Sequence, residues 1–314
     1  SNRFWCVLFK NAVTLFCMLL LGTAVVAQVL PLEGSGLNYR IVGFSFPFKY
    51  GAPAAKLEIA QGMYYDAATF GRHVIVSRPV KSERVIAEVP AFGANYTWRV
   101  VAGNKTAAGS GALHHFSTLY SAHADTGKVR LRILHAAQRY KNYYVSVDAG
   151  GVLYDMGGAP VWFLPDTNGT GGYLGDLKFT RAKTITFVKA NDAYAVTFKG
   201  DVLWKAPNNG SISGNLSHNE FYHHELTRLL NGHYMLMGTR AALCRSVVTR
   251  DTSYVELIND DGEAHPGYKL ARLGFLVELN KAGDMVWKWS SERRLVGSDF
   301  DYANHIDSNI RFDP

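Results

Sequence analysis

The chain has 314 residues, of which 47% are hydrophobic and 19% charged, as in an ordinary globular protein with room for two domains. Its formal net charge of +7 is spread along the chain without a block of lysine and arginine, so nucleic-acid binding has little support, whereas a mildly positive cleft for small anions remains compatible. Seventeen tyrosines, seventeen phenylalanines and thirty glycines, with few long helix-forming runs, favour an all-β fold.

Residues 1–27 have the pattern of a signal peptide. Arg3 and Lys10 accompany an apolar run, and small residues ending at Ala27 offer a cleavage site. The alternative is a membrane anchor, because the apolar run is nearly long enough to span a bilayer. No basic stop-transfer cluster follows, so we expect an exported, periplasmic or extracellular protein with no stable membrane insertion after cleavage. Cys244 would then be the only cysteine, which excludes an internal disulfide.

Residues 29–119 are predicted to form a small β-sandwich. The segment Ala91–Val101 alternates its side chains between two faces, and a glycine-rich turn and the strand Ala112–Thr118 follow it. This ending resembles the last strands of a fibronectin-type-III-like sandwich, a module that serves mostly as a spacer or docking surface. We interpret the adjacent His114 and His115 as residues of an edge strand.

Residues 129–314 are predicted to form a partial β-propeller, because a Gly-x-x-x-Trp signature recurs there. Its tryptophans are Trp162, Trp204 and Trp287, with spacings of 42 and 83 residues. A period of about 40–45 residues with a turn glycine and a strand tryptophan is typical of a four-stranded propeller blade. We interpret the three tryptophans as core residues of the repeats.

The 83-residue interval is either two degenerate blades or one blade with an insertion. We favour the insertion, because residues 237–269 include irregular, polar sequence, and we place Cys244 there as a small buried residue.

The segment Phe221–Gly238 is predicted to be a β-hairpin, because an Asn-Gly turn separates two runs of strand-forming residues. It carries the adjacent His223 and His224. Neighbouring side chains of a strand point to opposite faces, so we expect only one of the two histidines to face any given cleft, with Leu226 and Arg228 on the face of His224.

Two histidine segments carry a family resemblance. The run His224–Arg228 followed by Asn231–Tyr234 resembles the first active-site segment of the bacterial arylsulfate sulfotransferases. The run Asn304–Ser308 resembles their second histidine segment, and the likeness covers roughly residues 129–314. Asp307 differs from the family, which often has asparagine at this position.

The resemblance implies an exported, mostly homodimeric β-propeller enzyme. Such an enzyme moves a sulfuryl group from a phenolic sulfate ester to an acceptor phenol through a sulfohistidine, without a nucleotide or other cofactor. His224 and His305 match the histidines of the family's central channel, which act as oxyanion stabilisers or acid–base groups. The family's nucleophilic histidine and sulfate-binding arginine follow the second segment and have no match in this chain, so we expect the chain by itself to be inactive or nearly so.

Two other functions compete with this one. The first is a non-catalytic exported β-propeller that binds a ligand or partner at a degenerate channel. The second is a metal-dependent hydrolase that uses His223, His224 and His305. We rank the hydrolase last, because adjacent strand histidines diverge and rarely bind one ion together.

Overall fold

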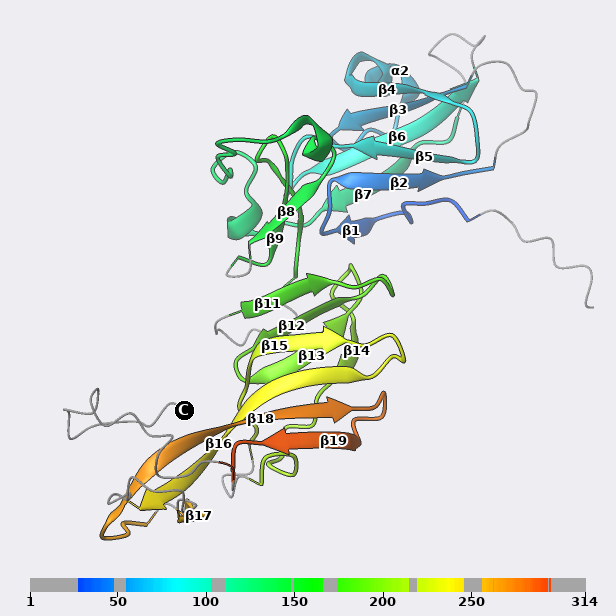
Figure 1. The fold of residues 1–314 in the computed structure, drawn as a ribbon. Coiled ribbons are helices and arrows are strands. Elements are labelled where there is room, and N and C mark those ends of the chain that lie inside the picture. The colour runs from blue at the N-terminus through cyan, green and yellow to red at the C-terminus, as the bar shows by residue number, and fades with distance from the viewer. Residues whose placement is uncertain are drawn as a thin grey trace, which may run out of the picture. The chain divides into compact units, whose positions relative to one another are not determined.

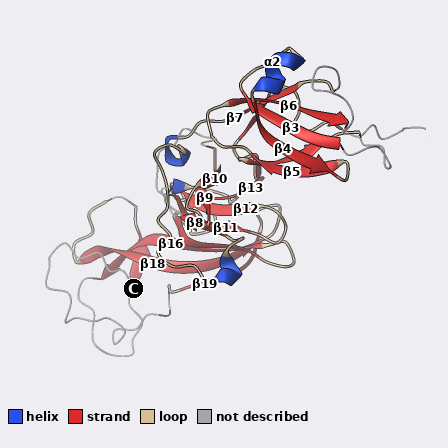
Figure 2. Cartoon of the chain, turned by 90° about the horizontal axis from the view of Figure 1, so that it is seen from above, coloured by secondary structure: helices blue, strands red, loops and turns tan. Residues whose placement is uncertain are grey.

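The computed structural model describes residues 28–47, 55–102, 111–147, 150–165, 174–214, 219–245, 256–261, 263–292 and 294 (Figure 1). The predicted signal peptide, His305 and Asp307 lie outside these ranges. The chain divides into two compact units, Ser1–Leu119 and Tyr120–Pro314. Both are built of β-strands with only short helical segments, so the predicted all-β class is confirmed (Figure 2). No helix in the described ranges is both long and apolar enough to cross a membrane.

The first unit contains two sheets and one short helix. The larger sheet has the strand order β1-β7-β6-β3-β4, and β2 pairs with β5 in the smaller one. All pairs are antiparallel except β1 with β7. The elements are β1 (Ser35–Leu37), β2 (Ile41–Ser45), β3 (Ala55–Gln61), α2 (Ala67–Arg72), β4 (Val74–Val80), β5 (Arg84–Glu88), β6 (Asn95–Ala102) and β7 (His114–Thr118).

The core of the first unit lies on one face of β6. Tyr96 and Trp98 alternate with residues of the opposite face, and Trp98 meets Phe44 of β2 edge-to-face at 5.1 Å between ring centroids. The Tyr96 hydroxyl donates to the carbonyl oxygen of Ala91 at 2.9 Å and accepts from its N–H at 3.0 Å, which fixes the corner before β6.

The interpretation of His114 and His115 as edge-strand residues is wrong. Strand β7 has β1 on one side and β6 on the other, so it lies inside the sheet. The His115 ring is buried, and its Nδ1 lies 2.7 Å from a Glu33 carboxylate oxygen while its Nε2 lies 2.8 Å from the Tyr64 carbonyl oxygen. These contacts satisfy both ring nitrogens.

The second unit contains three antiparallel sheets that follow one another along the chain. Their strand orders are β10-β9-β8, β11-β12-β13-β14 and β15-β16-β18-β19, and β17 pairs with β16 beside the last path. The 3-10 helices η1 (Ala122–Ala124) and η2 (Gln138–Tyr140) precede them. The strands are β8 (Tyr144–Val147), β9 (Val152–Asp155), β10 (Pro160–Phe163), β11 (Leu174–Phe179), β12 (Ile185–Lys189), β13 (Asp192–Val196), β14 (Val202–Lys205), β15 (Tyr222–Arg228), β16 (Tyr234–Arg245), β17 (Leu257–Asn259), β18 (Tyr268–Leu279) and β19 (Met285–Ser290).

The sheet β11–β14 and the sheet that begins with β15 share one hydrophobic core. Val188 and Ala195 of the former belong to the same buried cluster as Leu226 and Val277 of the latter. Trp204 belongs to the same cluster, and its ring stacks on Tyr234 of β16 at 3.8 Å between centroids. Through this cluster β12 and β13 pack against the sheet of β15, and β11 also lies beside β15.

The repeated tryptophans occupy equivalent positions, because each lies on the last strand of its sheet. Trp162 on β10 and Trp204 on β14 are buried, as predicted for core residues of a repeat. Trp287 on β19 is 47% exposed, so the prediction of a core position is wrong for it. Strand β19 is the last strand of the described residues, and no later described strand covers this tryptophan.

The 83-residue interval corresponds to one sheet that carries an insertion. Strands β16 and β18 are each twelve residues long and pair over that full length, while β17 pairs with residues Ala242–Cys244 of β16. The prediction of irregular structure is therefore wrong for residues 237–245, which lie in β16. Cys244 lies on this strand and is buried, as expected, and burial raises the pKa of its thiol.

Candidate functional site

A cavity of about 420 Å³ lies where β11 and β15 run beside each other. It is entirely within the second unit. Residues of β11, of β12 and the turn that follows it, and of β15 form its wall. They are Gly175, Asp176, Val188, Ala190, Asn191, Tyr222, His223 and His224.

A bulge in β15 turns both histidines toward this cavity. Tyr222 pairs with Gly238 and Leu226 with Leu236, so four residue steps of β15 match two steps of β16. Within the bulge, His224 has a φ of 61°, a left-handed conformation that is uncommon for a residue other than glycine. The alternation of side chains is therefore broken at His224.

The predicted separation of the two histidines onto opposite faces is wrong for this reason. His223 and His224 line the same cavity, whereas Leu226, predicted to share the face of His224, is fully buried in the core. Residues held in left-handed backbone conformations cost on the order of 1–3 kcal/mol and occur preferentially at functional sites.

The two imidazoles form a hydrogen-bonded pair. Their Nδ1 atoms lie 2.7 Å apart with ring planes at 89°, and the Nε2 of His223 bonds to the hydroxyl of Thr239 on β16. The Nε2 of His224 has no hydrogen-bond partner among the described residues. It is therefore the nitrogen of the pair that is available to a ligand.

The hydrogen bonds from Thr239 through His223 to His224 can run in either direction. If His223 donates to Thr239, its Nδ1 accepts from His224, and the Nε2 of His224 carries a lone pair. If Thr239 donates to His223, then His223 donates to His224, and the Nε2 of His224 carries a proton. Neutral His224 can thus act as a base or as an acid, depending on the direction of this chain.

A second bulge, in β11, places Asp176 opposite β15. Gly175 pairs with Val188 and Lys178 with Thr186, which leaves one extra residue in β11, and Asp176 has a φ of 57°. The carboxylate of Asp176 accepts from the backbone N–H of Leu226 at 2.5 Å. This bond connects the two distorted strands beside the histidines.

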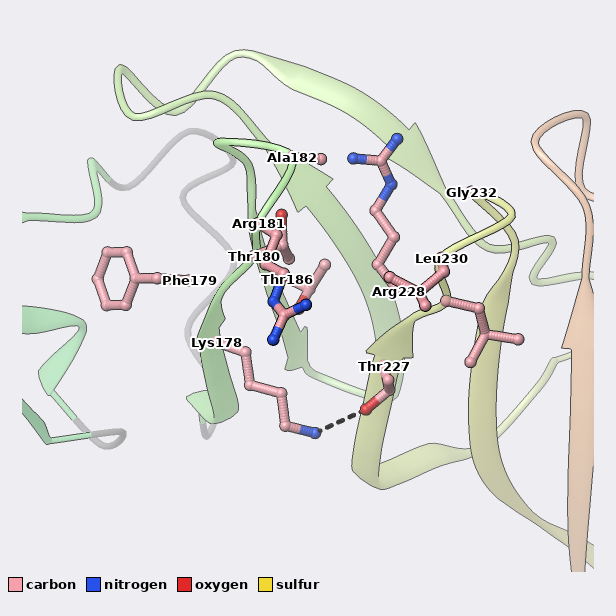
Figure 3. A pocket seen from close by; sticks show the side chains of 11 residues that line it. Lys178, Phe179, Thr180, Arg181, Ala182, Thr186, Thr227, Arg228, Leu230 and Gly232 are labelled. Carbon is pink, nitrogen blue, oxygen red and sulfur yellow. Dashed lines mark hydrogen bonds between the residues drawn. The ribbon is translucent and has the colours of Figure 1, made fainter.

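Lys178 pairs with two carboxylates of this region. Its ammonium lies 2.9 Å from Asp176 and bonds to Glu225. It also donates to the Thr227 hydroxyl at 3.2 Å, the bond drawn in Figure 3. Burial opposes the charge of Lys178, but the hydrogen bonds to Glu225 and Asp176 outweigh it and raise its pKa. One ammonium offsets one of the two carboxylate charges, so Asp176, Lys178 and Glu225 together keep a single net negative charge beside the histidines.

The structure places His224 in the cavity, while His305 lies outside the described residues. Asp176 and Lys178 were not predicted, and His223 was expected to face away from the cleft of His224. The only sequence signal for the bulge in β11 is Gly175 inside a strand pattern, which often marks a bulge. In the described part of the chain, no group of three or more histidine, cysteine, aspartate or glutamate side chains is placed to hold a metal ion.

Comparison of the chain with protein-family models and with curated proteins finds no match. The interpretation of the cavity consequently depends on its geometry and on the chemistry of the residues that form it.

Proposed function

We propose that this chain is part of an arylsulfate sulfotransferase, and that the cavity with His223 and His224 takes part in moving a sulfuryl group from a phenolic sulfate ester to a phenol. The observation that carries the proposal is the hydrogen-bonded imidazole pair, whose two residues line a cavity of about 420 Å³. The resemblance of His224–Arg228 and Asn231–Tyr234 to the family's first active-site segment supports the same assignment.

We also propose the finer fold assignments that go with this family. The first unit is a fibronectin-type-III-like sandwich, supported by the bonds between the Tyr96 hydroxyl and Ala91, which match the tyrosine corner of such modules. The second unit belongs to a β-propeller. Three successive antiparallel sheets, with a repeated tryptophan on each last strand, support this assignment. Strands β11 and β15 would then line the central channel.

In this proposal His224 acts on the oxygens of the sulfuryl group. Sulfuryl transfer places negative charge on the sulfuryl oxygens and on the leaving phenolate oxygen, so a positioned N–H donor stabilises its transition state. A protonated Nε2 of His224 donates to these oxygens, and a Nε2 with a lone pair accepts the proton of the incoming phenol. The pair stays neutral when the proton accepted at the Nε2 of His224 shifts the two bonded protons along the chain and the Thr239 hydroxyl releases its own proton to solvent.

The test is a transfer assay on the complete product of the gene, with 4-nitrophenyl sulfate as donor and phenol as acceptor, in EDTA and without nucleotide. We expect nitrophenol release to accelerate with phenol concentration and to match the phenyl sulfate formed. Release that is indifferent to phenol would indicate hydrolysis, and no release would leave the cavity a ligand-binding site; either result contradicts the proposal.

Thr239→Val gives a sharper version of the assay. Valine keeps the shape of the threonine side chain but removes the hydroxyl that bonds to His223. We expect the rate of transfer to fall about tenfold or more while 4-nitrophenyl sulfate still binds, because the variant loses only the end of the hydrogen-bond chain. An unchanged rate would exclude Thr239 from the proposed relay.

A further inference from the structure

A second cavity, of about 460 Å³, lies beside the turn that joins β11 to β12 and the turn that joins β15 to β16 (Figure 3). Neither histidine of the candidate site lines it. Its wall consists of Lys178, Phe179, Thr180, Arg181, Ala182, Thr186, Thr227, Arg228, Leu229, Leu230 and Gly232.

Two polar side chains in this wall have hydrogen-bonding atoms without partners. The Nε and Nη1 of Arg228 are buried, and neither finds an acceptor among the described residues. The Thr186 side chain is completely buried, and its hydroxyl likewise has no partner there. Arg228 comes from β15 and Thr186 from β12, so residues of two neighbouring sheets that carry unsatisfied donors line one cavity.

The charge of the wall is positive. Lys178, Arg181 and Arg228 contribute cations, and none of the lining residues is acidic. The Lys178 ammonium is occupied by Asp176 and Glu225, which leaves the two arginines as uncompensated charges of the lining. The Arg228 side chain extends from β15 toward the turn at Ala182 (Figure 3).

The rest of the wall is partly apolar. Phe179 is 37% exposed and Leu230 is 95% exposed, so an apolar group attached to an anion would find a surface beside the arginine. Buried N–H and O–H donors without acceptors are costly, and a sulfate or phosphate group supplies several acceptor oxygens at once.

We propose that this cavity binds an oxyanion group, sulfate or phosphate, either free or as part of a larger ligand. Arg228 donates from its buried nitrogens, Thr186 donates its hydroxyl, and Arg181 adds charge at the exposed side. The site goes beyond the proposed sulfuryl transfer and does not require it, because the two histidines belong to the other cavity.

The first test measures binding of inorganic sulfate and of inorganic phosphate by calorimetry, against chloride of the same ionic strength. We expect saturable binding that Arg228→Gln weakens by roughly 10- to 100-fold, since hydrogen bonds to a charged group are lost. Arg272→Gln is the matched control. Arg272 lies exposed on β18, so its substitution removes the same charge without changing the cavity wall. If both variants lost the same affinity for sulfate or phosphate, the effect would come from net charge alone, and the proposed site would be overturned.

Thr186→Val gives a signature that a merely structural role would not produce. Valine has nearly the same shape and removes a buried hydroxyl without a partner, so the melting temperature in sulfate-free buffer should stay the same or rise. Sulfate affinity should nevertheless fall, because the ligand loses a donor. A loss of both stability and affinity, or a gain of affinity, would contradict the role of Thr186.

Titration with 4-nitrophenyl sulfate distinguishes the two sources of the oxyanion. If inorganic sulfate and the ester compete and both depend on Arg228, the site recognises the oxyanion itself; if only the ester binds and depends on Arg228, the group belongs to a larger ligand. Absence of saturable binding of sulfate, phosphate and ester would overturn the proposal. Ester binding that His224→Ala abolishes and Arg228→Gln leaves intact would also overturn it, while leaving the proposed transferase site in place.

Discussion

Replacing His224 by glycine and, separately, by alanine would measure the backbone distortion that brings the two histidines into one cavity. Both variants lose the imidazole and its hydrogen bond to His223, so these losses cancel when the two variants are compared. The remaining difference is the preference of the backbone at this position. In a regular strand glycine is less stable than alanine by roughly 0.5–1 kcal/mol, because it loses more conformational freedom on folding.

At His224 the sign should be reversed. The φ of 61° is left-handed, and this conformation costs a residue with a Cβ roughly 1–2 kcal/mol, whereas glycine adopts it freely. This cost exceeds the entropic penalty of glycine, so we expect His224→Gly to be more stable than His224→Ala by about 0.5–1 kcal/mol. For a unit of this size, that difference corresponds to a melting temperature higher by about 1–4 °C.

The assay is urea unfolding of both variants, supported by thermal unfolding followed by circular dichroism. The control is the difference in the free energy of unfolding between Thr227→Ala and Thr227→Gly. Thr227 lies on the same strand outside the bulge and has no positive φ, so this pair reports ordinary strand behaviour. If His224→Ala proved the more stable of the pair by 0.5 kcal/mol or more, the left-handed bulge would be refuted. The explanation for the shared cavity would then fail with it.

Two further predictions concern the surroundings of the site. Burial opposes ionisation of Glu225, but the hydrogen bonds from Lys178 and Thr227 outweigh it and lower the pKa of Glu225. Its contribution to stability is thus complete above the unfolded pKa of about 4.3 and is lost as the pH falls through the lower folded pKa. The free energy of unfolding of the wild type should therefore fall more steeply than that of Glu225→Gln below about pH 5. Parallel curves of unfolding free energy against pH would contradict this. Gly238→Ala should destabilise the protein by about 1–3 kcal/mol, because the added Cβ would overlap the Phe275 ring, while Gly274→Ala meets no atom within 4 Å and should cost nothing measurable; equal denaturation midpoints would contradict the close packing.

The sequence predicted the regular strands of the second unit, because the spacing of a repeated signature reflects how successive sheets are built. The recurring Gly-x-x-x-Trp marks the last strand of each sheet, and the Asn-Gly turn at residues 231–232 joins β15 to β16 as predicted. The insertion in the 83-residue interval also agrees with one long hairpin. Its extent was wrong, since Met237–Arg245 continues a strand that has few conventional turn signals to end it.

The site itself could not be predicted from the alternation of side chains. That argument assumes a regular ladder, and β15 departs from it at His224. Histidine is enriched among the non-glycine residues with a positive φ, but such residues are too uncommon for this preference to mark one position. The partner of the bulge, Asp176, lies 48 positions earlier in the chain. The contact between them depends on how two sheets pack, which a pattern within one strand does not contain.

The same limit explains the misplaced histidines of the first unit. Strand β7 has an edge-like sequence, but its parallel pairing with β1 brings in residues from the beginning of the domain. Glu33 then provides a hydrogen-bond partner for the His115 ring. The pattern within the strand does not indicate this partner. Both errors come from tertiary pairing, and not from the assignment of strands.

The most direct test of the account is made on the complete product of the gene: the rate of phenol-dependent sulfuryl transfer from 4-nitrophenyl sulfate by His224→Ala, compared with the wild type and with His265→Ala. His265 bonds to Asp261 at 2.9 Å, away from the cavity, and controls for the loss of an imidazole elsewhere. We expect His224→Ala to lower the rate by at least about 100-fold, since positioned acid–base groups contribute 10²–10⁴-fold, and His265→Ala to leave it unchanged. A folded His224→Ala protein that transfers the sulfuryl group at the wild-type rate would contradict the central role of the histidine pair.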